Sequence, residues 1–569
     1  MKLINEQFIQ LNIKEKQIIL SQIQNKDQKI FYTKLFKQEQ IPFIFIYDLI
    51  NIIDKSSKIF SDLKSLINLG SRISISINKK CLNKMRDFQK KSIKQIEELL
   101  STQAYIKGFM IFDEPGLGKT LTSICVMKGY YNTFDINLSK VPLVVVVPKT
   151  LIKQWINSLN KYFPNNSITT NPEIKSDIYV INFEKIEKFS DLHFDGCNVI
   201  IDEAHLLHNI ESERYKLIFY FLKYKSSFSL LLTGTPIRES IIDLFSLYAL
   251  ISQNILDIDL LIKVKNFLSQ YKYTGKFILS LIESCYIRNT KSQIFDDVGN
   301  IIMKPLLIKV DDFKFRKNKL GLDQIDSRFK DNINIIKKYR ELIDTDPKIK
   351  IIDEILHQVE YSQLKTILKR YPINPEYSKI ILEYFNLIYV KSKQSLKSKI
   401  WQELLDNTLE YIILNHLDNI KIIHKKYKKI LVVTKSRKII DLYLQRMSQI
   451  GINGLTIESS DSYNQRFEKI KMFETKQNIN FLISTYPIIE AGLDMPFIDN
   501  IFILDFPFRP HSLIQIINRK QRLNNIDENI FITFLKISYK HNIIDHHRII
   551  LFEIYQNVKK ILRILDEKD

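Results

Sequence analysis

Cysteine is nearly absent from the sequence, with four residues in 569. These residues stand far apart and form no C-x-x-C pair: Cys81, Cys125, Cys197 and Cys285. The scarcity excludes a disulfide framework, and the spacing argues against a structural zinc site. We therefore expect reduced thiols in an intracellular protein with a cytoplasmic location.

Targeting signals and long apolar runs are also lacking. Residues 1–7 carry charges throughout and are not followed by the apolar core of a secretory signal. The longest apolar run, 41–53, includes Asp48 and is shorter than the roughly 20 residues that a membrane-spanning helix needs. We expect a soluble protein with no membrane partner.

Residues for several other chemistries are missing. Asp545, His546 and His547 are adjacent, so their side chains diverge on a helix, and no third metal ligand is placed with them. No protease or glycosidase constellation is apparent. The sequence gives no reason to expect these activities.

Positive charge is what the sequence has in excess. Lys and Arg number 84 against 63 Asp and Glu, a net charge of +21. Such a balance is typical of proteins that bind polyanions. An A/T-rich coding sequence, which over-uses Ile, Lys and Asn, explains the charge equally well. The positive charge therefore supports nucleic-acid binding only together with motifs that indicate it. The length corresponds to about three to four domains.

The most informative stretch is a glycine-containing loop between a buried strand at 108–112 and a helix from 121. Glycines let the backbone approach phosphate closely, and the positive helix end attracts the anion. Lys119 is predicted to contact the β- and γ-phosphates, and the Thr120 hydroxyl to ligate Mg²⁺. The predicted ATP-binding loop is Asp113, Glu114, Pro115, Gly116, Leu117, Gly118, Lys119 and Thr120. Asp113 stands where the strict pattern G-x-x-x-x-G-K-[ST] has glycine, so a magnesium-binding acid must follow downstream.

Two acids supply that second signal at the end of a buried strand. Asp202 is predicted to hold Mg²⁺, and Glu203 to orient and deprotonate the attacking water. A helix N-cap followed by a first-turn carboxylate is the alternative for an isolated pair. Their place after a phosphate loop favours the catalytic reading. The segment 233–236 ends another buried strand and is predicted to relay the nucleotide state.

Strands and helices alternate over much of the chain, which predicts an α/β fold. Apolar runs without alternation indicate parallel strands buried on both faces, with ligands beyond their carboxyl ends. The runs lie at 142–148, 177–183 and 198–203 in a first lobe and at 429–434, 481–485 and 501–505 in a second lobe that has no phosphate loop. Helical spacing in between predicts a Lys-rich helical insertion. The predicted domains are an N-terminal accessory region 1–80 of probable helix, lobe one 81–300, an insertion 301–400 and lobe two 401–569.

Two arginines in the second lobe carry a specific expectation. Arg519 and Arg522 are three apart on a predicted helix, so they share a face and can reach one anion. From a facing lobe they would stabilise charge on the transferring phosphoryl group, an effect typically worth about 10³–10⁵ in rate. The alternative is a solvated basic helix face. Gln89, whose amide can pair with the adenine edge, is a candidate base reader.

The order of these segments resembles helicase superfamily 2 and, within it, the Snf2-like double-stranded DNA translocases. In the first lobe the resemblance rests on a glutamine motif at 85–89, D-E-x-G-L-G-K-T at 113–120, motif Ia at 145–155, D-E-A-H at 202–205, motif III at 233–236 with its tail at 243–247, and an R-R-T-K-like stretch at 286–291. Asp113 is therefore the family's own variant, whereas Asn289 replaces that stretch's second arginine. In the second lobe, 490–496 and 515–522 are similar to motifs V and VI, although Asn518 stands where glycine is usual and the motif V sequence is closer to general helicases.

The resemblance implies two RecA-like lobes that close on ATP and Mg²⁺ and move along nucleic acid. It implies that Asp494 bonds the ribose and that Gln515 meets His205 across the cleft. The candidate contacts to nucleic-acid phosphates lie at predicted strand ends: Lys149, Thr150, Asn182, Thr434, Lys435, Ser436, Ser484 and Thr485. The resemblance extends to the poxvirus-type D-E-A-H ATPases and to the helicase-like proteins of yeast cytoplasmic linear plasmids.

Three functions remain open from the sequence. The first is an ATP-dependent DNA helicase or double-stranded DNA translocase in replication or transcription. The second is an ATPase subunit that works with an RNA polymerase in initiation or termination without separating strands. The third is a nucleic-acid-binding scaffold that does not hydrolyse ATP, against which the intact Lys119, Glu203 and Arg522 argue.

Overall fold

The computed structural model describes most of residues 2–291 and, beyond them, 307–315, parts of 334–350, residue 368, 373–386 and most of 406–537. Inside these ranges it leaves out 5–6, 69–71, 78, 103–105, 191–195, 239, 253–255, 272, 336–337, 340, 348, 407–408, 411, 415–416, 491–494, 508–509 and 518–528. No helix in the described part combines the length and apolar character needed to cross a membrane. The described residues up to 291 belong to one compact unit, and those from 307 onward to a second.

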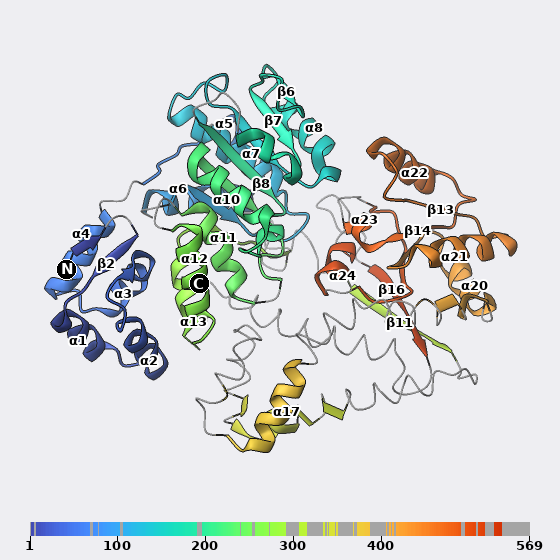
Figure 1. The fold of residues 1–569 in the computed structure, drawn as a ribbon. Coiled ribbons are helices and arrows are strands. Elements are labelled where there is room, and N and C mark those ends of the chain that lie inside the picture. The colour runs from blue at the N-terminus through green and yellow to red at the C-terminus, as the bar shows by residue number, and fades with distance from the viewer. Residues whose placement is uncertain are drawn as a thin grey trace. The chain divides into compact units, whose positions relative to one another are not determined.

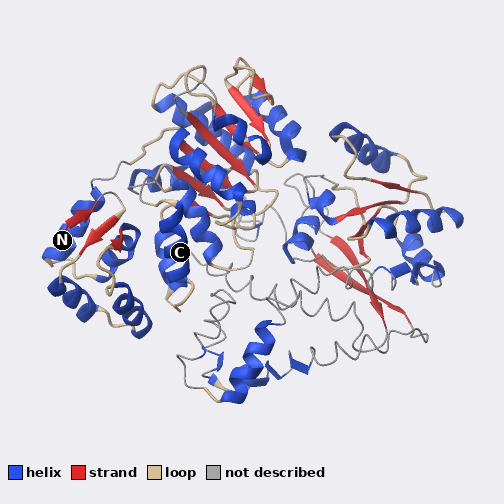
Figure 2. Ribbon diagram, in the orientation of Figure 1, coloured by secondary structure: helices blue, strands red, loops and turns tan. Residues whose placement is uncertain are grey.

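The first unit begins with an N-terminal module, residues 2–68, which combines helices with a small sheet (Figures 1 and 2). Its antiparallel strands are β1 (Lys2–Ile4), β2 (Phe8–Gln10) and β3 (Ile41–Pro42). Its helices are α1 (Ile13–Gln22), α2 (Lys26–Leu35), α3 (Ile46–Ile52) and α4 (Lys58–Asn68). The helical character expected for this region is confirmed, and the sheet is additional. β1 and β2 form a local hairpin with strands of three residues each, whereas β3 joins the sheet from about 30 residues further along the chain. Strands this short give little sequence signal.

The N-terminal module packs against two helices of lobe 1 through aromatic rings and one buried acid. Phe31 makes edge-on ring contacts with Phe267 and Tyr273, at centroid distances of 5.1 and 5.4 Å. The Asp48 carboxylate accepts hydrogen bonds from the hydroxyls of Tyr32 and Tyr273, at 2.5 and 3.0 Å. Burial raises the pKa of Asp48, and these donors oppose that shift. The module is therefore integral to the first unit.

Lobe 1 is a seven-stranded parallel sheet with the order β10-β4-β9-β8-β5-β7-β6. Its strands are β4 (Gly108–Ile111), β5 (Leu143–Val146), β6 (Ile168–Thr169), β7 (Ile178–Ile181), β8 (Cys197–Asp202), β9 (Ser226–Leu232) and β10 (Tyr286–Ile287). Its helices are α5 (Lys79–Leu82), α6 (Asp87–Thr102), α7 (Lys119–Thr133), α8 (Ile152–Tyr162), α9 (Glu187–Ser190), α10 (Glu213–Lys225), α11 (Ile242–Ile251), α12 (Ile258–Leu268) and α13 (Thr274–Ile282). Because every strand runs the same way, the loops that follow β4, β9, β8 and β5 meet at one edge, where ligands of such sheets bind.

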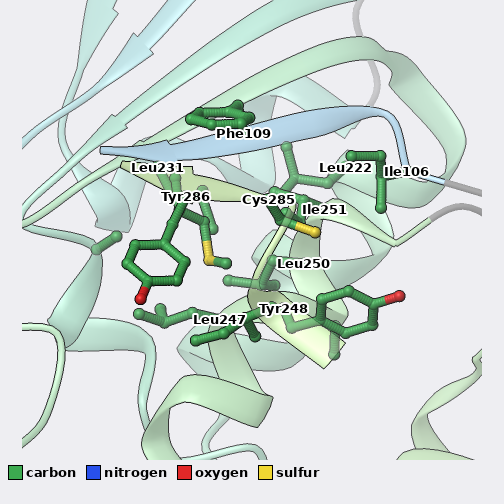
Figure 3. Close-up of a cluster of buried hydrophobic side chains, with 14 of the residues drawn as sticks. Ile106, Phe109, Leu222, Leu231, Leu247, Tyr248, Leu250, Ile251, Cys285 and Tyr286 are labelled. Atoms are coloured by element: carbon green, nitrogen blue, oxygen red, sulfur yellow. The ribbon is translucent and has the colours of Figure 1, made fainter. Parts of the chain in front are cut away.

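Large apolar side chains pack on both sides of β4, with Phe109 on one side and Leu247 and Leu250 on the other (Figure 3). Phe109, Cys285 and Leu231 are fully buried there, together with Leu247 and Ile251 of α11. The backbone of the same region is joined by hydrogen bonds from Met110 N to Cys285 O and from Phe112 N to Ile287 O, at 2.8 and 2.9 Å. β10 is thus fixed beside β4 up to the point where the predicted phosphate loop begins.

The four cysteines of the chain are buried without a disulfide, as the sequence predicted. The sulfurs of Cys81 on α5 and Cys125 on α7 are hydrogen-bonded to each other. Cys197 begins β8, and burial raises the pKa of its thiol well above the usual value. These residues act as small apolar side chains in lobe 1.

Lobe 2, in the second unit, is a six-stranded parallel sheet with the order β11-β16-β15-β12-β14-β13. Its strands are β11 (Leu307–Phe315), β12 (Ile430–Thr434), β13 (Gly454–Thr456), β14 (Phe481–Thr485), β15 (Asn500–Ile503) and β16 (Asn529–Ile537). Its helices are α20 (Leu417–Lys426), α21 (Arg437–Gln449), α22 (Tyr463–Thr475), α23 (Tyr486–Glu490) and α24 (Pro510–Ile517), and α17 (Pro375–Phe385) lies between β11 and β12 in sequence. The α/β class with two parallel-sheet lobes is confirmed.

The predicted helical insertion at 301–400 needs a correction, because it includes β11. This strand pairs in parallel with β16, from Leu307 beside Asn529 to Phe315 beside Ile537. Its partner is more than 200 residues away in sequence, and Lys309, Asp311, Asp312 and Lys314 interrupt the apolar run by which inner strands were recognised. An edge strand tolerates such charges. Residues 307–315 therefore belong to the sheet of lobe 2.

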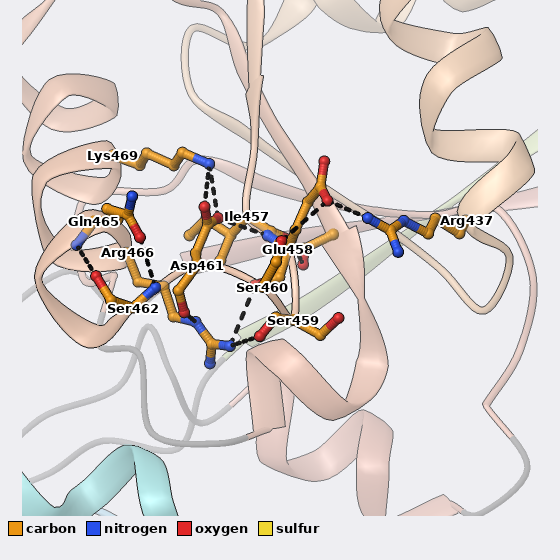
Figure 4. A network of polar contacts seen from close by, with 11 residues as sticks. Arg437, Ile457, Glu458, Ser459, Ser460, Asp461, Ser462, Gln465, Arg466 and Lys469 are labelled. Atoms are coloured by element: carbon orange, nitrogen blue, oxygen red, sulfur yellow. Dashed lines mark hydrogen bonds and ion pairs between the residues drawn. The ribbon is translucent and has the colours of Figure 1, made fainter.

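A polar network closes the loop between β13 and α22 of lobe 2 (Figure 4). The Asp461 carboxylate accepts hydrogen bonds from Glu458 N at 2.8 Å and from Lys469 Nζ at 2.7 and 2.8 Å. Arg466 donates to Asp461 O at 3.0 Å, and Ser462 caps α22 in a capping box with Gln465. These bonds lower the pKa of Asp461 although partial burial opposes them. The loop is ordered by its own side chains.

Candidate active site

The predicted phosphate loop follows β4 and ends within the first turn of α7, which begins at Lys119. Gly116 and Gly118 have φ angles of 91° and 83°, in the left-handed region that glycine adopts without strain. Lys119 Nζ donates to Asp113 O at 2.8 Å and to Glu114 O at 3.4 Å, so its ammonium lies over the loop. Gly118 is the N-cap of α7 and provides no side-chain cap, which leaves this positive helix end suited to an anion.

Gln89 on α6 supports the far end of the loop. Its buried amide donates to Leu117 O at 3.2 Å, and its carbonyl oxygen accepts from Arg86 N at 3.1 Å. A Cβ on Gly118 would lie 2.7 Å from Gln89 Nε2, so a side chain there would displace the Gln89 amide, and the φ angle is what favours glycine. This supporting role was not predicted, and base recognition by Gln89 stays a prediction.

The two predicted catalytic acids end β8, where Asp202 pairs with Leu232 of β9. Asp202 Oδ2 accepts from Trp155 Nε1 of α8, and Oδ1 accepts from Glu203 N, both at 2.9 Å. Burial and then the charge of Glu203 raise the pKa of Asp202 to about 6, while Trp155 and Lys119 oppose the shift. The electrostatic influence of Lys119 means that loop and acid lie close together. Trp155 had been recognised only as part of motif Ia.

Glu203 has a φ of 54°, unusual for a residue with a side chain. Holding a non-glycine residue in this region costs of order 1–3 kcal/mol and is concentrated at functional sites. Glu203 Oε2 lies 3.2 Å from His205 Nδ1. The strained turn therefore directs the Glu203 side chain toward His205.

His205 joins the acids to the segment that ends β9. Its Nδ1 lies 3.0 Å from Thr233 Oγ1 and 3.4 Å from Thr235 Oγ1. Thr233 Oγ1 also accepts from Thr235 N at 3.1 Å, and His205 is almost completely buried. A change at the Glu203 carboxylate can reach the Thr233–Thr235 turn through one imidazole ring.

Gly234, in the same turn, touches the phosphate loop. A Cβ on Gly234 would lie 2.7 Å from Pro115 Cδ and 3.1 Å from Pro115 N. Only glycine lets these two turns approach so closely. The loop after β4, the acids after β8 and the turn after β9 therefore form one contiguous site, as the predicted parallel sheet requires.

The predicted nucleic-acid contacts lie at strand ends, but several of their side-chain atoms are buried. In lobe 1, Thr150 Oγ1 and Asn182 Oδ1 are buried without a hydrogen bond to any described residue, and Lys149 begins the short turn after β5. In lobe 2, the Ser484 hydroxyl is fully buried and donates to Ile457 O at 2.6 Å. Because that hydroxyl is committed inside the sheet, we no longer expect Ser484 to contact a phosphate through its side chain.

The remaining lobe 2 positions differ in exposure. Thr434 is buried and accepts from Ser436 N at 3.2 Å, whereas Thr485 is partly exposed at the end of β14. Lys435 N donates to both oxygens of Asp505, at 2.9 and 3.2 Å. These backbone and side-chain bonds fold the loop after β12. Whether Thr434, Lys435, Ser436 and Thr485 bind phosphates stays a prediction.

Three predicted residues lie outside the described part of the chain: Asp494, Arg519 and Arg522. Gln515 is described and is buried in α24. The meeting of Gln515 with His205, and of the arginines with a nucleotide on lobe 1, would join the two units, so both stay predictions.

The residues at this site fit a nucleoside triphosphate and its metal ion. Lys119 and the uncapped end of α7 offer positive charge for phosphates, and the Thr120 hydroxyl and Asp202 carboxylate offer the oxygen ligands that Mg²⁺ prefers. Glu203 adds a second carboxylate at the same edge for activating water. The arrangement can support hydrolysis of a phosphoanhydride.

Two family models match the chain. The model of the SNF2-related domain matches residues 79–316, and that of the helicase conserved C-terminal domain matches residues 410–524. The first match begins after the N-terminal module and extends to β11. The second covers most of lobe 2, including the predicted motifs V and VI.

The chain is also similar to bacterial proteins named as uncharacterized ATP-dependent helicases. It is 24% identical to YqhH of Bacillus subtilis over 474 residues, which are 80% of this chain and 77% of that protein. It is 27% identical to MG018 of Mycoplasma genitalium over 285 residues, which are 44% of this chain and only 26% of that protein. The solved Sulfolobus solfataricus SWI2/SNF2 ATPase core in complex with dsDNA matches 83% of this chain and 90% of that chain, with 16% identity and a TM-score of 0.33. That score is too low to bear on how the lobes are arranged.

Proposed function

We propose that this ATP hydrolase, which combines an SNF2-related domain with a helicase C-terminal domain, is an ATP-dependent DNA helicase or double-stranded DNA translocase. The observation that carries the proposal is the position of His205 Nδ1, which lies 3.2 Å from Glu203 Oε2 and 3.0 Å from Thr233 Oγ1. It links the residue that activates water to a turn at the strand ends, where phosphate contacts were predicted. A plain nucleotide hydrolase has no need for such a link.

Each group of lobe 1 has a defined part in hydrolysis. Lys119 neutralises charge on the β- and γ-phosphates, and Glu203 orients the attacking water and accepts its proton. Thr120 and Asp202 would hold Mg²⁺, which when bound neutralises charge that develops on the phosphate oxygens. Arg519 and Arg522 from lobe 2 would complete the site, so that the lobes close on ATP and open after hydrolysis.

The same cycle would move a nucleic-acid strand. Contacts from strand ends in both lobes, among them Lys149, Asn182 and Lys435, would hold the sugar-phosphate backbone and not the bases. Opening and closing the lobes once per ATP would then shift the strand. The names of YqhH and MG018 as ATP-dependent helicases support this reading.

The test is the ATP turnover of the full chain with duplex DNA, single-stranded DNA and RNA, each at saturation. We expect at least tenfold stimulation by duplex DNA. With about five phosphates neutralised, the log of DNA affinity should fall against log salt with a slope near −4. Preference for single strands would favour a conventional helicase over a duplex translocase. Turnover that none of the three polymers stimulates would contradict the proposal.

A further inference from the structure

We infer that Asn289 is a positioning residue for the phosphate loop, which it fixes by holding the Asp113 carboxylate from the neighbouring strand. The inference concerns how the proposed ATP site keeps its affinity and rests on that proposed function. Neither residue type is what the strict motifs contain at its position: Asp113 replaces a glycine, and Asn289 replaces an arginine. Asp113 matches the Snf2-like form of the loop, so the departure that the pairing explains is Asn289.

Asp113 needs no glycine-like backbone, because its φ is not positive. Its side chain is 1% exposed and points into the lobe. Asn289 donates to Asp113 Oδ1 twice, from its backbone N at 2.9 Å and from Nδ2 at 2.7 Å. A buried carboxylate is costly unless it is hydrogen-bonded, so these two donors decide whether Asp113 can stay in place.

The backbone around this pair is held as well. Asn289 O accepts from Glu114 N at 3.0 Å, and Arg288 Nη1 donates to Phe112 O at 2.9 Å. Lys291 N donates to Glu114 Oε2 at 2.9 Å. Residues 288–291, which continue β10, therefore bind three successive residues at the start of the loop.

The pair bears directly on the phosphate-binding lysine. Lys119 Nζ donates a hydrogen bond to Asp113 O at 2.8 Å. A shift of the Asp113 backbone would therefore change the position of the Lys119 ammonium group. The catalytic acids Asp202 and Glu203 end β8 and do not touch Asn289. Losing the Asn289 bonds should therefore weaken nucleotide binding more than it slows the chemical step.

Asn289 also connects the two ends of the loop. Its Nδ2 lies 2.9 Å from Ser92 Oγ on α6. One turn earlier on that helix, Gln89 donates to Leu117 O near the end of the loop. Helix α6 thus supports the loop at its start through Asn289 and at its end directly.

The decisive variants are Asn289→Ala and the pair Asp113→Ala and Asp113→Asn. We expect Asn289→Ala and Asp113→Ala each to raise KM for ATP and Kd for ADP about tenfold, with kcat within about threefold of wild type. Asp113→Asn keeps a carbonyl oxygen for both Asn289 donors and should stay within about threefold of wild type in KM. The double variant Asp113→Ala/Asn289→Ala should be no worse than either single variant, because both break one interaction.

The measurements are steady-state turnover with saturating duplex DNA and calorimetric ADP binding, with the exposed Asn160→Ala as the control. Partial unfolding would lower the apparent kcat and leave KM unchanged, so the KM shift distinguishes positioning from stability. Should Asn289→Ala fail to fold, the two Asp113 variants make the same comparison. Unchanged KM and ADP affinity in the alanine variants, or an Asp113→Asn variant as impaired as Asp113→Ala, would overturn the inference. ADP binding decides the matter even if wild-type turnover needs no nucleic acid, an outcome that would count only against the proposed function.

Discussion

Lobe 1 and lobe 2 are built on the same sheet but differ in what the first strand carries. Apart from the extra edge strand β10, the orders β4-β9-β8-β5-β7-β6 and β11-β16-β15-β12-β14-β13 correspond strand by strand, also in their order along the chain. In lobe 1 the first strand, β4, leads directly into the phosphate loop and α7. In lobe 2 the first strand, β11, is followed by the long segment that precedes β12. The two lobes share the order of their strands, but only lobe 1 carries the predicted phosphate loop after its first strand.

The corresponding strands β8 and β15 both lead to a buried aspartate. Asp202 is the last residue of β8, and Asp505 follows β15 by two residues. The pKa of Asp202 and that of Asp505 are both raised to about 6, in each case by burial first. Asp202 lies beside Glu203 and within the influence of Lys119, whereas Asp505 binds the backbone N of Lys435. The charge of Asp406 also raises the pKa of Asp505, so a neighbouring carboxylate does not by itself distinguish the two acids. Asp505 therefore shapes the loop after β12, whereas the role of Asp202 in the chemistry stays a prediction.

The largest effect should come from Glu203→Gln. Without a carboxylate to accept the proton, turnover should fall about 10²–10⁴-fold while ATP binding persists. The matched lobe 2 variant Asp505→Asn, which keeps an acceptor for Lys435 N, should stay within about threefold of wild type. Steady-state turnover and nucleotide binding measure both. A Glu203→Gln protein with more than a tenth of wild-type turnover would remove the proposed role.

The second-largest effect should come from two glycine variants, one at the predicted ATP site of lobe 1 and one in the sheet of lobe 2. Comparing them distinguishes an effect on ATP binding from an effect on stability. Gly234→Ala forces a Cβ against Pro115 of the phosphate loop, and Gly454→Ala forces one to within 2.2–2.5 Å of the Phe481 ring in lobe 2. Each should destabilise the protein by about 1–3 kcal/mol through overpacking. Only Gly234→Ala should also raise KM for ATP, by about tenfold. Equal KM values for the two variants would show that the Gly234 contact does not matter for binding.

The sequence predicted those parts of the site whose residue types are tied to chemistry. Lys119, Asp202, Glu203 and the parallel strands around them could be identified because phosphate, metal and water activation each demand particular groups at strand ends. The residues that hold these groups in place could not be predicted from the sequence. Asn289 acts from nearly 180 residues beyond the loop it holds, and nothing local in its sequence marks that partner.

Two features of lobe 2 could not be read from the sequence for the same physical reason. β11 was assigned to a helical insertion because edge strands lack the unbroken apolar run of inner strands. Ser484 was predicted to contact a phosphate from a strand end, and the sequence could not show that its hydroxyl donates to Ile457 O inside the sheet. Strand position along the sheet and side-chain direction both depend on pairing with distant residues.

A pH profile should reveal the special environment of the lobe 1 acid. Asp202 must be ionised to hold Mg²⁺, so turnover at limiting Mg²⁺ should fall as the pH drops below about 6. Trp155→Phe removes a hydrogen bond that favours the carboxylate, so it should raise the pKa of Asp202 and move this acid limb upward by about one pH unit. Asp505→Asn should leave the limb unchanged. A downward shift in Trp155→Phe would contradict the assignment.

The smallest effect should come from one lysine in each lobe that binds carbonyl oxygens at the end of a helix, although the two lysines precede strands that do not correspond. Lys107, just before β4, donates from Nζ to Leu222 O and Lys223 O at the end of α10, at 2.6 and 2.9 Å. Lys429, just before β12, likewise donates to Lys476 O and Ile479 O after α22, at 2.8 and 3.0 Å. Lys107→Met and Lys429→Met should each cost about 1 kcal/mol in denaturant unfolding and leave KM for ATP unchanged. A KM change in Lys107→Met alone would mean that this cap belongs to the site.

The central claim is that one ATP bound to lobe 1 is hydrolysed with help from lobe 2. It is tested most directly by Arg522→Ala, assayed for ATP binding and for turnover with saturating duplex DNA. The account predicts ATP affinity within about threefold of wild type and turnover lowered by about 10³-fold or more. Wild-type turnover in Arg522→Ala would contradict it, since lobe 1 alone would then suffice.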